Sequence, residues 1–251
     1  MLELKELSKD FGGLRAVNKV SFHVKEGQLT SLIGPNGSGK TTMFNMISGV
    51  FPPSEGSIVL AGQNINGLRS DQIVNLGVCR TFQELRVFNS LTVIENVMIG
   101  LHVRAKSGIW GSTLRLPSER QERKLLRQKA VQLLELMRIA DKRNLMPSSL
   151  PYAEQRMIDI ARALASGVRV LLLDEPAAGM NPNEKQRLAD ILVKIQKEIC
   201  NTVFLIEHDM KFVMSISEYI GVLNFGTLIA EGVPEEIKKN QDVIQAYLGT
   251  D

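Results

Sequence analysis

The stretch Gly34-Pro35-Asn36-Gly37-Ser38-Gly39-Lys40-Thr41-Thr42 matches the pattern G-x-x-x-x-G-K-[ST] and directly follows the apolar run Leu29-Thr30-Ser31-Leu32-Ile33. Its glycines let the backbone turn inward and point successive N–H groups at a polyphosphate without Cβ atoms in the way. Such a loop joins a strand to a helix, and the positive N-terminal end of that helix attracts the same anion. The stretch therefore predicts a phosphate-binding loop in an α/β fold.

The loop also predicts roles for its side chains. Lys40 is expected to reach the β- and γ-phosphates of a nucleotide, and the hydroxyl of Thr41 is expected to bind Mg²⁺. The other members of the predicted nucleotide-binding set are Asn36, Gly37, Ser38, Gly39 and Thr42. The pattern also occurs by chance, so the prediction of nucleotide binding needs support from other segments of the chain.

A second segment, Val170-Leu171-Leu172-Leu173-Asp174-Glu175-Pro176, is an apolar run that ends in two carboxylates. Such a run is typical of a strand buried on both faces of a parallel sheet, where ligands lie at the carboxyl ends of the strands. Asp174 is therefore predicted to hold Mg²⁺, and Glu175 to activate the water that attacks the γ-phosphorus. The alternative interpretation is a simple Asp-Glu-Pro turn after a core strand.

The apolar spacing divides the chain into a predicted core and a predicted helical lobe. Strand-like runs with turns at 11–13 and 61–62 predict an antiparallel β subdomain, and 202–206 reads as another buried strand. Between residues 91 and 166 the spacing is helical. Apolar faces are predicted at Leu126, Ala130, Leu133, Leu134 and Met137, at Met157, Ile160, Ala161 and Leu164, and at Leu188, Ile191, Leu192, Ile195 and Ile199. We predict one domain over 1–251, with an α/β core at 1–90 and 167–251 around a mostly parallel sheet, and a helical lobe at 91–166.

Composition is that of an ordinary globular protein, with 44% hydrophobic and 23% charged residues in 251. A net charge of +3 is too small to indicate nucleic-acid binding, and no apolar run predicts a membrane span or a secretory signal, so we expect a cytosolic protein unless something tethers it. Cys79 and Cys200 lack metal-ligand spacing and are expected to be reduced thiols. Residues 101–143 carry eleven Lys and Arg against four acidic residues. This segment is either a solvated helix face or a surface for phospholipid or an acidic protein.

Several separated segments together resemble the ATP-binding-cassette (ABC) ATPases. Arg80-Thr81-Phe82-Gln83 is similar to the glutamine loop of that family, and Phe204-Leu205-Ile206-Glu207-His208-Asp209 to its histidine switch. Residues 11–17, 176–182, 230–237 and 246–249 are similar to the ATPase subunits of importers for branched-chain amino acids. The resemblance implies a P-loop NTPase (RecA-like) core that uses ATP and Mg²⁺. It also implies that Phe11 stacks on adenine, that Gln83 binds Mg²⁺ and that His208 acts with Glu175.

The family signature, commonly Leu-Ser-Gly-Gly-Gln, departs from its usual form here. The matching stretch is Leu150-Pro151-Tyr152-Ala153-Glu154-Gln155, and in the family it completes the ATP site of a partner subunit. Pro151 lacks a hydroxyl and an N–H, Ala153 adds a methyl group, and Glu154 brings a carboxylate near an anion. We hypothesise a heterodimer with unequal sites. The alternative is that neighbouring N–H groups and the helix dipole suffice.

The resemblance implies an ATPase that powers import of branched-chain or other hydrophobic amino acids from the cytoplasmic face of the membrane. The implied partners are permease subunits, a second ATPase subunit and a solute-binding protein, with no nucleic acid. Uptake of urea or another amide, lipid export, and a nucleotide-gated interaction subunit with weak hydrolysis remain alternatives. A DNA- or ribosome-acting relative is disfavoured, because such relatives usually carry coiled-coil insertions or two fused cassettes.

Overall fold

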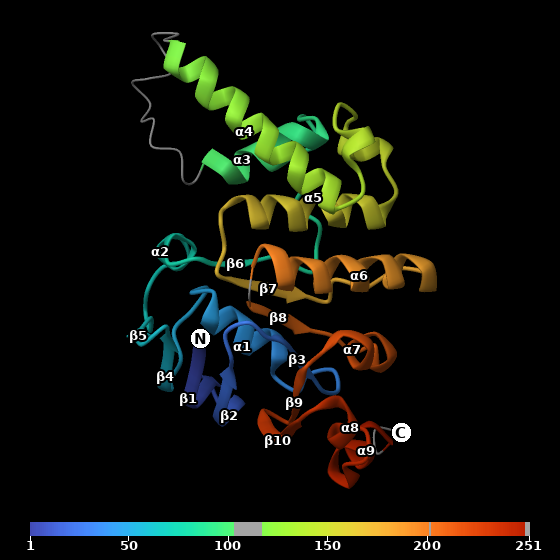
Figure 1. Cartoon of the computed structure of the whole chain (residues 1–251). Coiled ribbons are helices and arrows are strands. Elements are labelled where there is room, and N and C mark those ends of the chain that lie inside the picture. Colours follow the sequence, from blue (N-terminus) through green and yellow to red (C-terminus); the bar gives the residue numbers. More distant parts are fainter. Residues whose placement is uncertain (103–116, 201, 249–251) are drawn as a thin grey trace.

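The computed structural model describes residues 1–102, 117–200 and 202–248, in which two β-sheets are surrounded by helices (Figure 1). A four-stranded antiparallel sheet has the strand order β2-β1-β4-β5. Its strands are β1 (Leu2–Phe11), β2 (Leu14–Val24), β4 (Glu55–Leu60) and β5 (Gln63–Asn64). The turns predicted between these strands are confirmed, and so is the antiparallel β subdomain.

The six-stranded sheet has the order β10-β9-β3-β8-β7-β6. Its strands are β3 (Leu29–Ile33), β6 (Val78–Arg80), β7 (Val170–Asp174), β8 (Thr202–Ile206), β9 (Tyr219–Asn224) and β10 (Thr227–Gly232). All neighbouring pairs are parallel except β9 with β10. The prediction of a mostly parallel sheet is therefore confirmed.

Both faces of the six-stranded sheet are buried, which explains its continuous apolar runs. Leu171 and Leu173 of β7 belong to one hydrophobic cluster, whereas Val170 and Leu172 belong to the other, because successive side chains of a strand point to opposite faces. The first cluster is shared with helices α3 (Val93–His102), α4 (Pro117–Leu136), α5 (Tyr152–Ala165) and α6 (Pro182–Glu198). The second is shared with helix α1 (Lys40–Ile47) and with the four-stranded sheet.

The helices around the core are short except for α6. They are α1 (Lys40–Ile47), α2 (Ser70–Asn75), α6 (Pro182–Glu198), α7 (Met210–Ile216), α8 (Pro234–Ile237) and α9 (Gln241–Leu248). The N-cap of α6 is Asn181, whose side chain accepts hydrogen bonds from the backbone of Asn183 and Glu184. Ile199 was predicted on the buried face of α6, but the helix ends at Glu198, and Ile199 is exposed.

A second group of helices lies above the six-stranded sheet in Figure 1. It contains α3 (Val93–His102), α4 (Pro117–Leu136), two 3₁₀ turns (Ala140–Lys142 and Pro147–Ser149) and α5 (Tyr152–Ala165). α3 packs against both α4 and α5. The domain boundaries at residues 91 and 166 stay a prediction. Arg104, Lys106 and Arg115 of the predicted basic segment lie outside the described residues.

Two expectations from composition can be compared with the described residues. Within 1–102, 117–200 and 202–248, no helix has both the length and the apolar character needed to span a bilayer. Cys79 and Cys200 are free thiols, and burial raises the pKa of both, that of Cys200 to about 11. Neither is therefore ionised at neutral pH, and both behave as small hydrophobic side chains.

Candidate nucleotide-binding site

The predicted phosphate loop joins β3 to α1, and its glycines are required by their surroundings. Gly34 and Gly39 have positive φ angles of 150° and 102°. A Cβ atom at Gly34 would collide with the Leu223 carbonyl, and one at Gly39 would lie 2.6 Å from the Ala16 carbonyl oxygen. The backbone of the loop therefore fits closely between β9 and β2, and α1 starts directly after Gly39.

Lys40 lies inside the loop rather than on its surface. Its side chain is largely buried, at 6% exposure, and Nζ donates to the carbonyl oxygens of Gly34 and Pro35, each at 2.8 Å, and to Ser38 Oγ at 3.3 Å. Burial lowers the pKa of Lys40, while the charges of Glu175 and Asp174 act in the opposite direction. The ammonium group is thus held within the ring of backbone atoms that the sequence predicts for phosphate.

Three predicted catalytic side chains meet at one oxygen atom. Gln83 Nε2 donates to Glu175 Oε2 at 3.1 Å, and His208 Nδ1 lies 3.7 Å from the same oxygen. These residues follow β6, β7 and β8, which are parallel neighbours, so their carboxyl ends lie side by side. Sheet order therefore brings together residues that are far apart in the sequence.

Glu175 also has an unusual backbone conformation. Its φ angle is 45°, in the left-handed region that costs a residue with a side chain about 1–2 kcal/mol. The backbone N–H of Glu175 donates to the Ile206 carbonyl at 3.0 Å, which links the residue to β8. Conformational strain of this kind concentrates at functional sites, where the surrounding structure enforces it.

A cavity of about 590 Å³ lies where these groups meet. Its lining residues are Gly34, Pro35, Asn36, Gln83, Glu175, His208 and Tyr247. Tyr247 comes from α9, shares a hydrogen bond with the Gly34 backbone, and has its pKa raised to about 12 by burial. Sequence reasoning noticed Tyr247 only as part of a family likeness and assigned it no role.

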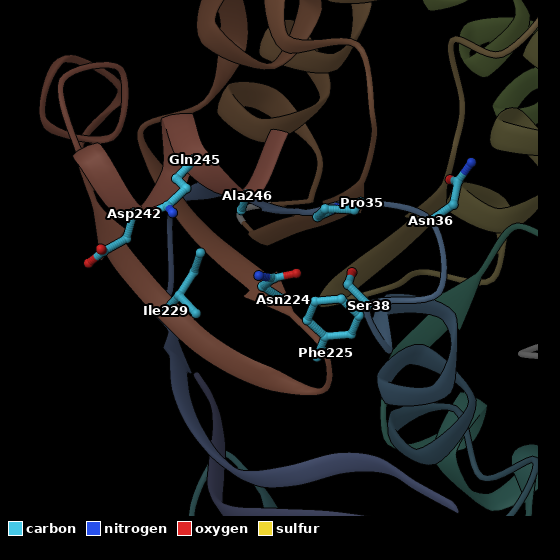
Figure 2. A pocket seen from close by; sticks show the side chains of 9 residues that line it. All are labelled: Pro35, Asn36, Ser38, Asn224, Phe225, Ile229, Asp242, Gln245 and Ala246. Atoms are coloured by element: carbon cyan, nitrogen blue, oxygen red, sulfur yellow. The ribbon is translucent and has the colours of Figure 1, made fainter. Parts of the chain in front are cut away.

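A second cavity, of about 620 Å³, lies on the other side of the loop (Figure 2). Pro35 and Asn36 line both cavities, so the loop separates them. In Figure 2 the Asn36 side chain points away from the other lining residues. The turn between β9 and β10 supports this side, because Gly226 N donates to the Ser38 carbonyl at 3.0 Å.

The predicted magnesium ligands suit a site that depends on the nucleotide. No group of three His, Cys, Asp or Glu side chains that could hold a metal occurs among the described residues. Mg²⁺ prefers oxygen ligands and usually combines one or two carboxylates with substrate phosphates and water. The Thr41 hydroxyl, the Gln83 amide oxygen and the buried Asp174 carboxylate fit this requirement.

Phe11 is not among the residues that line the 590 Å³ cavity. It ends β1, and its half-exposed ring meets Phe51 edge-on, with ring centroids 5.3 Å apart. The Lys9 ammonium group lies 5.3 Å from the centroid of the same ring. The role of Phe11 in adenine stacking stays a prediction.

The structure gives the local surroundings of two signature residues, and their role at a partner's ATP site stays a prediction. Helix α5 begins at Tyr152 with Pro151 as its N-cap, and this phase places Ala153 in the hydrophobic core at 8% exposure. The methyl group of Ala153 therefore packs against the hydrophobic core of this chain. Glu154 forms an ion pair with Lys142 at 2.5 Å, so its charge is neutralised locally and the expected repulsion of an anion is weakened.

Arg156 joins the signature helix to the segment that carries Gln83. Its guanidinium is fully buried and donates to the carbonyl oxygens of Phe82 at 2.6 Å and Gln83 at 2.5 Å. It also donates to the Tyr152 hydroxyl at 2.8 Å. Sequence reasoning missed this contact, because no local pattern shows where a buried arginine will point.

Family comparisons agree with this geometry. The ABC transporter family model matches residues 17–178, and the branched-chain amino acid ATP-binding cassette transporter model matches residues 227–251. The high-affinity branched-chain amino acid transport ATP-binding protein LivG of Escherichia coli K12 is 43% identical over 249 residues, which are 99% of this chain and 98% of that protein. BraF of Pseudomonas aeruginosa, described in the same words, is also 43% identical over 249 residues, with coverage of 99% and 98%.

A solved ATP-binding cassette of an ABC transporter in its ADP conformation superposes with a TM-score of 0.86 at 26% identity, covering 99% of this chain and 98% of that one. A dimeric bacterial ABC transporter cassette gives a TM-score of 0.78 at 26% identity, with coverage of 93% and 99%. These structures share the arrangement of sheets and helices described above. The alignments with LivG and BraF cover nearly the whole of this chain and of each relative. The chain therefore belongs to the family of ABC transporter ATP-binding proteins.

Proposed function

We propose that this chain is the ATP-hydrolysing subunit of an importer for branched-chain or other hydrophobic amino acids. The observation that carries the hydrolytic part is the convergence of Gln83, Glu175 and His208 at one cavity beside the loop that contains Lys40. The similarity to LivG and BraF supports the class of solute, since 43% identity extends over 99% of the chain.

The reaction assigns a separate task to each side chain. The loop N–H groups and Lys40 hold the phosphates. Glu175 accepts a proton from the attacking water while the water oxygen forms a bond to the γ-phosphorus. The bond from that phosphorus to the bridging oxygen breaks, which leaves ADP and phosphate. His208 and Gln83 orient the water and the γ-phosphate. Thr41, Asp174 and Gln83 would hold Mg²⁺, which would neutralise the negative charge of the phosphates.

The partners we propose are a second ATPase subunit, permease subunits and a solute-binding protein, with this chain at the cytoplasmic face of the membrane. The second ATPase subunit meets the N-terminus of α5, where the Tyr152 side chain is exposed. The hypothesis of unequal sites rests on Pro151, Ala153 and Glu154. In this chain Ala153 packs in the core and Glu154 pairs with Lys142.

A depression beside the Gln83 segment is the surface that we assign to the permease. It has a volume of about 330 Å³ and is lined in part by Arg86, Phe88, Asp159 and Arg162. Phe88 is an exposed aromatic side chain, and Arg162 donates to the Arg86 carbonyl at 2.5 Å. A permease bound at this depression would lie next to the segment that carries Gln83. Changes at the nucleotide could therefore reach the permease through that segment.

Two substitutions test the catalytic part. Glu175→Gln should retain ATP binding and lower phosphate release by about 10²- to 10⁴-fold, because it removes the general base. Lys40→Ala should abolish productive ATP binding, and Arg69→Gln, at an exposed ion pair with Asp71, is the control. Turnover at the wild-type rate in Glu175→Gln would refute the assignment.

The solute is tested with the chain assembled with its permeases and solute-binding protein in liposomes. We expect leucine or valine to stimulate ATP hydrolysis and to accumulate inside. Stimulation by urea, or extraction of lipid from the bilayer, would replace the amino-acid assignment with one of the alternatives.

A further inference from the structure

Arg80 forms a buried ion pair with a predicted magnesium ligand, and the family motifs give it no role. Its Nη2 donates to Asp174 Oδ2 at 2.5 Å, and both side chains are only 4% exposed. The two residues are 94 positions apart in the chain. They meet because β6 and β7 are parallel neighbours in which Arg80 is in register with Leu172, close to the end of β7.

The guanidinium is anchored on its other side by α1, the helix that follows the phosphate loop. Nη1 donates to Asn45 Oδ1 at 2.6 Å and to Ser48 Oγ at 3.2 Å. These contacts fix the direction in which the planar group presents Nη2 to Asp174. Arg80 therefore links the carboxyl end of β7 to α1.

The surroundings of this arginine exclude water. Its guanidinium carbon lies 5.7 Å from the ring centroid of Phe44 and 5.1 Å from that of Phe82. In such an apolar environment a buried polar group without a partner is disfavoured, so the anchored guanidinium holds the Asp174 carboxylate in one orientation.

We propose that Arg80 is a positioning residue for the metal site, which holds the Asp174 carboxylate in the orientation that binds Mg²⁺ with the nucleotide. Arg80 has two opposite effects on the affinity of the site for Mg²⁺. The positive charge of Arg80 repels Mg²⁺, whereas its hydrogen bond orients the ligand. Because Asn45 and Ser48 hold the guanidinium in place, the orienting effect dominates. Partners that orient metal ligands typically change metal affinity by about 10- to 100-fold.

This inference rests on the proposed function, and its test measures metal binding rather than turnover. The full-length chain is saturated with a non-hydrolysable ATP analogue, and Mn²⁺ is titrated in while free Mn²⁺ is followed by electron paramagnetic resonance. Affinity for the analogue in EDTA is measured separately with a fluorescent nucleotide. Arg80→Gln should weaken Mn²⁺ binding about tenfold and leave the affinity for the analogue in EDTA unchanged.

Two further variants make the test decisive. Asn45→Ala removes one anchor but keeps the arginine, so it should weaken Mn²⁺ binding in the same direction by a smaller factor, and it carries the test if Arg80→Gln does not fold. Arg69→Gln, at the exposed pair with Asp71, should change nothing. Unchanged or tighter Mn²⁺ binding in Arg80→Gln or Asn45→Ala would overturn the inference. If wild-type protein binds no nucleotide even with the metal, the proposed function fails instead.

Discussion

Replacing Arg156 by methionine should weaken both the stability of the chain and the attachment of the Gln83 segment to α5. The guanidinium of Arg156 is fully buried and makes hydrogen bonds of 2.6, 2.5 and 2.8 Å to Phe82 O, Gln83 O and Tyr152 Oη. Methionine preserves a long apolar side chain but supplies no donor, so two carbonyl oxygens lose a charged partner.

The magnitude follows from these contacts. Hydrogen bonds that involve a charged group contribute roughly 1.5–3 kcal/mol each, so the three together represent a gross loss of at least about 4.5 kcal/mol. Part of this loss is offset, because a buried guanidinium no longer has to be desolvated. We expect the free energy of unfolding to fall by about 3 kcal/mol, and Tm to fall by about 6 to 12 °C for a chain of this size.

Urea unfolding measures the global change, and hydrogen exchange followed by mass spectrometry locates it. Exchange should accelerate in residues 80–88 more than in the strands of the six-stranded sheet. Arg169→Met is the matched control, since Arg169 lies on an exposed surface and its guanidinium meets Met1 Sδ at 3.9 Å. An Arg156→Met protein within about 1 kcal/mol of the wild type, with unchanged exchange in 80–88, would contradict this reasoning.

Two further predictions concern residues around the catalytic oxygen. Glu175 has a φ angle of 45°, which glycine adopts more easily than alanine, so the free energy of unfolding of Glu175→Gly should be about 1 kcal/mol higher than that of Glu175→Ala. Both variants lack the general base, so urea unfolding compares their stability alone. An alanine variant that is equally or more stable would refute the claim that the backbone of Glu175 is strained. Burial raises the pKa of Glu207 above 4.5, so the folded state binds its proton more tightly than the unfolded state, and this stability is present at low pH and is lost as pH rises through the raised pKa. Glu207→Gln cannot ionise, so its free energy of unfolding relative to the wild type should increase as the pH rises above about 4.5, whereas a constant difference would argue against a raised pKa.

The positions of several strands, the phosphate loop and several site residues could be predicted from sequence, because their causes are local. Because glycine has no Cβ atom, the loop can close around Lys40. The apolar run before Asp174 is short and continuous, which is typical of a strand buried on both faces. Glu175 and His208 follow two runs predicted as buried parallel strands, so they are expected at one edge of the sheet, and the structure places them there. Gln83 is identified only through the family resemblance, and the structure places it beside Glu175.

Tertiary structure decided the partners of charged side chains. Arg80 meets Asp174 because β6 pairs with β7, and the order of strands in a sheet is not written in any local pattern. Arg156 reaches Gln83 for a similar reason, since α5 packs across the segment that follows β6.

Helix phase decided the remaining differences at the signature. A rotation of about 100° per residue determines whether the Ala153 methyl group faces a ligand or the core, and only the packed helix settles this direction. By itself the sequence determined which chemical groups are available to a nucleotide. The tertiary structure determined which of them are turned toward it, because long-range packing sets the orientation of every element.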